Sequence, residues 1–206
     1  MNRVIVTLIC AAATATLVVG CGSRVEPGSG SAPPSAAPPA AGAPALTGDD
    51  VALATANAAA DDLGRSLRAR LLAAMGEGGP TQAVDVCTQE ATTIAAAVAA
   101  RNHARVGRGS LRMRGATAAP DWVQAWLRAQ GERPAAGVVG FARVEDGHAR
   151  VLRPIAIEAP CLHCHGDSVA PAVSALLAEH YPSDSATGYR LGDLRGALWA
   201  EVELSH

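Results

Sequence analysis

The sequence predicts an α+β domain in which two helices come first and a mostly antiparallel sheet follows. Apolar residues recur at helical spacing between residues 49 and 101. In shorter segments between residues 105 and 204 they alternate at the spacing of strands. Hydrophobic residues make up 49% of the chain but aromatic residues only 3%. Because alanine supplies much of this apolar content, we expect a core of closely packed helices with small side chains.

Residues 1–20 are predicted to form a lipoprotein signal peptide. Arg3 provides a short positive region, and a nearly uncharged apolar run from Val4 to Val19 follows it. The run ends at Gly20-Cys21, where a small residue precedes the cysteine that would be lipidated. The alternative is ordinary secretion after a cleavage site near residues 11–15. Both readings place the mature protein outside the cytoplasm.

A flexible tether is expected to follow the lipidated Cys21. Residues 21–46 are dominated by Gly, Ser, Pro and Ala, a composition that cannot bury a core and favours a disordered linker. The folded domain is then expected over residues 47–206. We expect a lipid anchor on the periplasmic side of a bacterial membrane, and Gly22 after the cysteine favours the outer membrane.

Two helices are expected to form an antiparallel hairpin at the start of the domain. Leu63, Leu67 and Leu71 mark a helix over residues 49–75, and the Gly- and Pro-containing segment 76–80 is expected to end it. A second helix is expected over residues 81–101, with Cys87 on its apolar face. The other residues of that face are Val84, Ala91, Ile94 and Val98.

The remaining elements alternate between strands and short helices. The weak alternation of residues 105–114 indicates a strand, and residues 120–129 indicate a short helix. Two strands, 138–144 and 149–157, flank the turn Glu145-Asp146-Gly147 and predict a hairpin. A short helix is expected within residues 161–180, and the final strand over residues 196–204.

The most specific motif is Cys161-Leu162-His163-Cys164-His165, which has the C-x-x-C-H spacing of c-type haem attachment. In this chemistry the two thiols bond covalently to one haem, and His165 becomes the proximal iron ligand. A redox-active cysteine pair is the first alternative. A zinc site is the second, although no convincing further ligands stand at suitable spacing. The net charge of −2 argues against nucleic acid as a partner.

The ligand on the other face of the iron is open on sequence grounds. Cys87 is the favoured candidate because it would be left unpaired on an apolar helix face in an oxidising compartment. A buried structural thiol is its ordinary role. An open coordination position is another reading, and the other candidate ligands are Met75, Met113, His103, His148 and His180.

Arginines are candidate partners for the two haem propionates, since a guanidinium matches a carboxylate in shape and charge. Arg112 and Arg114 would share one face if residues 105–114 formed a strand. Arg112 and Arg153 are the two predicted contacts, and a solvated strand face is the ordinary alternative for both.

Most of residues 50–204 resemble a bacterial family of PAS-like single-haem c-type domains that often sit at the sensory end of signalling proteins. The similarity runs from Leu67 to Ile94, then through Val106–Ser110, Arg153–Ile155 and Cys161–Gly166. It closes at Ala186–Tyr189 and Gly192–Leu198. The resemblance implies a PAS-like antiparallel sheet, covalent haem on Cys161 and Cys164, and Cys87 as the sixth ligand opposite His165.

The function expected from the sequence is therefore a membrane-tethered, single-haem sensor of redox state or of a small ligand. We expect reduction to weaken the iron–thiolate bond of Cys87 and open the site. A periplasmic electron-transfer cytochrome without a sensing role is the alternative. An enzyme such as a peroxidase ranks lowest, because no distal acid–base pair can be placed beside the iron from the sequence.

Overall fold

The computed structural model describes residues 46–115 and 118–204. The predicted signal peptide, the lipidation site Cys21 and the linker up to residue 45 lie outside the described residues. Among the helices that are described, none has the length and apolar character needed to cross a membrane.

Helices precede most of the strands, as the sequence predicts. The helices before β2 are α1 (Gly48–Asp85), the π-helical segment η1 (Val86–Glu90), α2 (Ala91–Asn102) and α3 (Asp121–Gln130). Near the cysteine motif lie the 3-10 turn η2 (Ala159–Cys161), α4 (Leu162–His165) and α5 (Pro171–His180). The strands are β1 (Arg105–Gly109), β2 (Phe141–Glu145), β3 (His148–Ala156) and β4 (Leu194–Glu203). They form one sheet of order β1-β4-β3-β2 with every neighbouring pair antiparallel.

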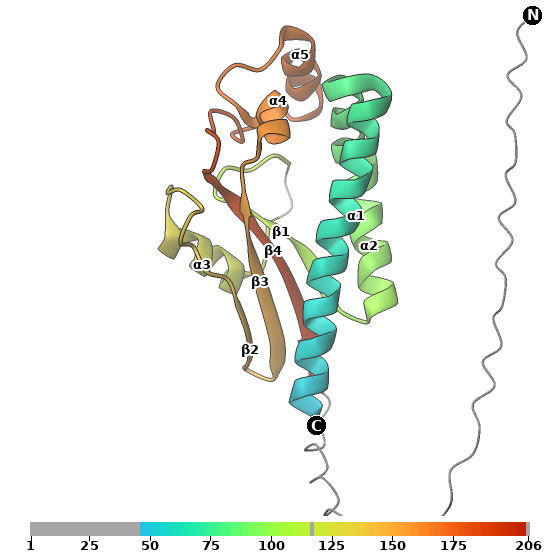
Figure 1. Cartoon of the computed structure of the whole chain (residues 1–206), viewed down its shortest axis with the longest axis vertical. Coiled ribbons are helices and arrows are strands. Elements are labelled where there is room, and N and C mark those ends of the chain that lie inside the picture. Colours follow the sequence, from blue (N-terminus) through green and yellow to red (C-terminus); the bar gives the residue numbers. More distant parts are fainter. Residues whose placement is uncertain (1–45, 116–117, 205–206) are drawn as a thin grey trace, which may run out of the picture. The chain divides into compact units, whose positions relative to one another are not determined.

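The expected helical hairpin is present, although its reversal is shorter than the predicted turn at residues 76–80. Thr47 and Asp50 form a capping box that starts α1. The helix continues to Gly79, whose left-handed φ of 72° bends the chain just before Pro80. The chain then runs back beside its own first half (Figure 1). The Arg101–Asp62 ion pair, at 2.7 Å, joins the two limbs.

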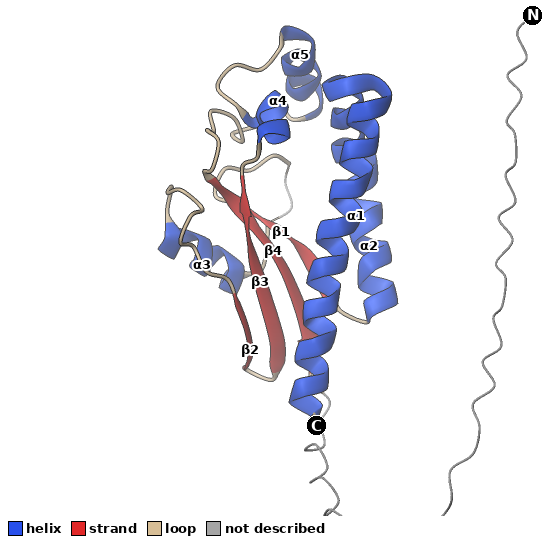
Figure 2. Cartoon of the chain, viewed as in Figure 1, coloured by secondary structure: helices blue, strands red, loops and turns tan. Residues whose placement is uncertain are grey.

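Each face of the sheet packs against a different helix (Figure 2). On one face, α1 presents small residues to the strands, which confirms the expected small-residue core. The buried residues there are Ala52, Ala56, Ala59, Ala60, Ala149, Val151 and Ala200. On the other face, Val123 and Leu127 of α3 pack against Leu152 and Trp199.

The predicted strand hairpin is confirmed by β2 and β3. Asp146 and Gly147 both have positive φ, 51° and 73°, which suits the two-residue turn that joins twisted antiparallel strands. The predicted strand over residues 105–114 is wrong beyond Gly109. Ser110 ends it because its hydroxyl lies within hydrogen-bond distance of the backbone carbonyls of both Arg112 and Arg195, at 2.9 and 2.8 Å, where the chain turns out of the sheet. Arg112 and Arg114 therefore do not share a strand face.

Candidate haem-binding site

The cysteine motif forms a single short turn directly after β3. Pro160 lies within η2, and α4 follows with both Cys164 and His165. Cys164 is packed among Val84, Val173 and Leu177, whereas Cys161 contacts the cluster around Ile157 and Tyr189. Both thiols are half-buried and neither forms a disulfide. Burial raises the pKa of the Cys164 thiol.

His165 is oriented by one short hydrogen bond. Its Nδ1 atom lies 2.7 Å from the carbonyl oxygen of Ala186, so Nδ1 carries the proton and donates it. Burial lowers the pKa of His165 to about 3, and the positive charges of Arg195 and Arg114 act in the same direction. The imidazole is therefore neutral at physiological pH. Because Nδ1 is the donor, the lone pair of Nε2 is left for another partner.

A buried ion pair clamps the motif from the loop that follows α5. Arg114 and Asp184 lie 2.8 Å apart with side chains only 8% and 10% exposed. The Arg114 Nη2 atom also donates to the carbonyl of Cys164 at 2.7 Å. Two backbone bonds reinforce the clamp, from Gly188 to Gly166 and from Tyr189 to His165, each 2.9 Å long. Sequence reasoning missed this role of Arg114 and Asp184, which stand 70 residues apart in the chain.

Cys87 approaches the motif from the helical hairpin. Val84, three residues before it, packs in the same cluster as Cys164, and α5 completes that cluster. Burial raises the pKa of both Cys164 and Tyr181, and Cys87 is near enough that a negative charge on it would raise them further. Cys87 also lies within η1, the π-helical segment. Single π turns in α-helices occur often at functional sites, and the sequence predicted an uninterrupted α-helix here.

The other candidate iron ligands lie in different places. His103 ends α2 and His148 begins β3, so both lie at the opposite end of the sheet from α4. Met75 packs inside the helical hairpin against Ala74, Ala83 and Val86. Met113 lies in the loop before Arg114, where its carbonyl accepts a hydrogen bond from Ser185. His180 is exposed at the last residue of α5.

The two arginines predicted as propionate contacts already have carboxylate partners. Arg112 forms a two-pronged pair with Glu132 at 2.8 and 2.9 Å, and Arg153 reaches Asn57 and Asp61 on α1. Arg108, in contrast, is exposed and forms no ion pair within the described part of the chain. Arg108 stands opposite Leu198, whose side chain lies against Gly64 of α1. Arg108 therefore projects from the α1-facing side of the sheet.

The fold and the motif define a class of chains in which a helical hairpin and a four-stranded antiparallel sheet support a C-x-x-C-H turn. The chain belongs to the Tll0287-like family, which matches residues 40–202. Among solved structures, the crystal structure of the cyanobacterial heme-protein Tll0287 has the same fold, with a TM-score of 0.52. The two sequences are 24% identical over 73% of this chain and 92% of that one. No curated protein matches. The fold and the family expected from the sequence are thus confirmed.

Proposed function

We propose that this chain is an exported, lipid-anchored cytochrome that carries one covalent haem c and senses redox state or a small ligand. Cys161 and Cys164 would hold the haem covalently, and His165 would be the proximal ligand. The observation that carries the proposal is the geometry of His165. On the same turn as two free thiols, its ring is held neutral with Nδ1 engaged by Ala186.

The residues present fit a haem in two respects. The two thiols are half-buried and unpaired, as covalent attachment requires. The Nδ1 hydrogen bond to a carbonyl fixes the ring and increases the basicity of Nε2, as is usual for histidines that bind metals. The related Tll0287 is a heme-protein. The bound group would supply an iron that changes oxidation state and binds small ligands.

Cys87 is proposed as the second axial ligand. Its proximity to Cys164 and Tyr181 supports this role, and so does its place in the π-helical segment. Cys87 would hold the iron together with His165, and the iron would supply the change of oxidation state to which the site responds. The place of Cys87 in η1 would link that change to the helical hairpin.

Arginines would neutralise the propionates. Arg108 is the best placed, because it is exposed on the α1-facing side of the sheet without a carboxylate partner in the described chain. Arg112 and Arg153 remain proposed contacts that would have to share or exchange their present partners, Glu132 and Asp61.

The location of the protein is proposed from the sequence alone. The apolar run up to Val19, the lipidation site Cys21 and the linker that follows support a lipid anchor on the periplasmic side, with the outer membrane favoured. The anchored domain would act on a redox or signalling partner within reach of the linker.

The decisive test is the absorption spectrum of the full chain, produced in a bacterium that assembles c-type cytochromes. We expect covalent haem in the native chain and none in the Cys161→Ser/Cys164→Ser double variant. The ferric spectrum should carry a thiolate signature that Cys87→Ala removes, and carbon monoxide should bind only after reduction. Val86→Ala, a replacement of the neighbouring residue, is the matched control and should leave the thiolate signature in place.

Other outcomes would redirect the proposal. A six-coordinate spectrum in both oxidation states, with no uptake of carbon monoxide and no effect of Cys87→Ala, would support the electron carrier instead. A chain that assembles without covalent haem would remove the cytochrome assignment altogether.

A further inference from the structure

A cavity of about 290 Å³ lies behind Tyr189, on the side of the sheet covered by α3. It is formed by the end of α3, the segment 131–134 and the start of β4. Tyr189 separates it from the cysteine motif, since the Tyr189 ring packs edge-on against His165 with centroids 6.3 Å apart. None of the three cysteines of the domain lines the cavity. It shares Arg112 with the proposed propionate contacts, but it does not include the residues that would attach the haem.

The cavity has an excess of positive charge. Four arginines line it, together with the carboxylates Glu132 and Asp193. Glu132 is taken by Arg112, and Asp193 accepts the backbone amide of Arg190 at 2.7 Å. The guanidinium groups of Arg133, Arg190 and Arg195 form no ion pair within the residues that the structure describes.

Arg195 is the most unusual of the three. It is largely buried, and its Nη1 atom contacts only neutral oxygens, the Ser110 hydroxyl and the Arg112 carbonyl. Its guanidinium also lies over the Tyr189 ring at 5.4 Å. A guanidinium removed from water without an anion is costly, so such a position is normally completed by a negative partner.

Apolar side chains form the rest of the wall. Leu111, Leu127 and Leu194 line the cavity, and the last two are buried. A ligand that satisfies both parts of the wall has a negative group and a small hydrocarbon body. The arginines favour a carboxylate, because a guanidinium matches it in shape and charge. Arg133 already donates from Nε and Nη2 to Gln130, and Arg195 donates from Nη1 to Ser110 and the Arg112 carbonyl, so the anion would be met by the nitrogens that these bonds leave free. The volume is close to the lower limit of about 300 Å³ for small-molecule sites.

We propose that this cavity binds a small organic carboxylate, with its anionic group on Arg195 and Arg133 and its hydrocarbon part against Leu127. A ligand held there touches Tyr189, whose ring also packs against His165. Binding of a ligand in the cavity would therefore affect the cysteine motif through the ring of Tyr189.

The test is isothermal titration calorimetry of the purified full chain with butyrate, succinate and benzoate, and with inorganic phosphate for comparison. We expect at least one carboxylate to bind at a single site with a Kd below about 1 mM. Arg133→Gln is the main variant, because Arg133 is exposed and its replacement removes only two exposed hydrogen bonds to Gln130 from the fold. It should weaken binding roughly tenfold, as expected for the loss of one charge-assisted contact.

Arg128→Gln is the matched control. Arg128 is an exposed arginine of α3 that does not line the cavity, so its loss removes the same charge from the same region. The affinity of the Arg128→Gln variant for the carboxylate should stay within about twofold of the native value. Equal weakening by both variants would show diffuse attraction of anions and overturn the site. Binding of phosphate alone, or of none of the carboxylates, would overturn the ligand class.

Discussion

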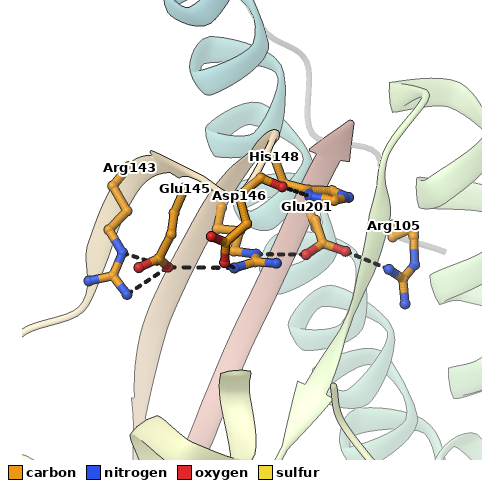
Figure 3. A network of polar contacts seen from close by, with 7 residues as sticks. Arg105, Arg143, Glu145, Asp146, His148 and Glu201 are labelled. Atoms are coloured by element: carbon orange, nitrogen blue, oxygen red, sulfur yellow. Dashed lines mark hydrogen bonds and ion pairs between the residues drawn. The ribbon is translucent and has the colours of Figure 1, made fainter. Parts of the chain in front are cut away.

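The two ends of the sheet differ in whether their arginines have carboxylate partners. At the β2–β3 turn, Glu201 is only 3% exposed and lies between two arginines, with Arg150 at 2.8 Å and Arg105 on its other side (Figure 3). Arg150 also reaches Glu145 and Asp146. At the end that carries the cysteine motif, Arg108 and Arg195 have no carboxylate partner within the described chain.

This difference separates charges that are paired within the fold from charges that the proposals above assign to ligands. A buried carboxylate is tolerated when hydrogen-bonded cations surround it, and Glu201 meets that condition. Arg108 is exposed, and the Nη1 atom of Arg195 bonds to neutral oxygens, so neither arginine forms an ion pair within the described chain. The two proposals above assign these cations to bound anions, the haem propionates for Arg108 and a small carboxylate for Arg195.

Arg114 and Arg112 do have carboxylate partners near the motif, and the buried pair of Arg114 gives the largest expected effect. Arg114→Met leaves Asp184 buried without its cation and leaves the Cys164 carbonyl without its donor. The expected loss in the free energy of unfolding is about 3–5 kcal/mol, measured by urea denaturation of the haem-free Cys161→Ser/Cys164→Ser chain. Arg112→Met, whose partner Glu132 is exposed, is the control and should cost less than about 1 kcal/mol. Equal losses would remove the distinction between the clamp and its neighbour.

At the opposite end, Glu201→Gln tests the paired network. The amide keeps the shape of the side chain but loses its charge, so both Arg105 and Arg150 lose an ionic partner. Arg150 retains Glu145 and Asp146, which limits the damage. We expect a loss of about 1–3 kcal/mol in the free energy of unfolding, by the same urea measurement. An unchanged stability would mean that the network stabilises no more than an exposed pair does.

The elements of the fold could be predicted because each has a local cause. The capping residues of α1, the leucine spacing that follows and the Asp146-Gly147 turn act over a few residues, so they can be read directly. The C-x-x-C-H motif is local for the same reason. The strand predicted over residues 105–114 failed because the hydroxyl of Ser110 reaches Arg195, and that contact exists only in the folded chain.

The surroundings of the site could not be predicted from the sequence. The Arg114–Asp184 pair, the Ala186 carbonyl that orients His165 and the partners of Arg112 and Arg153 all come from segments distant in the chain. An arginine count cannot tell which guanidinium will find a carboxylate. The π-helical segment around Cys87 was missed too, because an extra residue within one turn leaves the apolar pattern nearly unchanged.

A smaller effect is expected at the ion pair that joins the helical hairpin. Hydrogen bonds from Arg101, then Asn102, hold the pKa of Asp62 well below its ordinary value of 3.8. A carboxylate with a depressed pKa stabilises the fold above the pKa of the unfolded state, and this contribution is lost as the pH falls through the folded pKa. Asp62→Asn should therefore lower the thermal midpoint at pH 7, with a gap from the native chain that narrows below about pH 4. A gap that stays constant with pH would contradict the assignment.

The smallest effect on stability is expected for the substitution Arg108→Gln. Because Arg108 is exposed and has no carboxylate partner in the described chain, Arg108→Gln should change the unfolding free energy of the haem-free chain by less than about 0.5 kcal/mol. In the haem-loaded chain the same change should lower the reduction potential, since removal of a nearby positive charge disfavours the added electron. Arg65→Gln, an exposed arginine on α1, should alter neither quantity. If Arg108→Gln destabilised the haem-free chain as Glu201→Gln does, both ends of the sheet would use their arginines for folding, and the contrast between them would disappear.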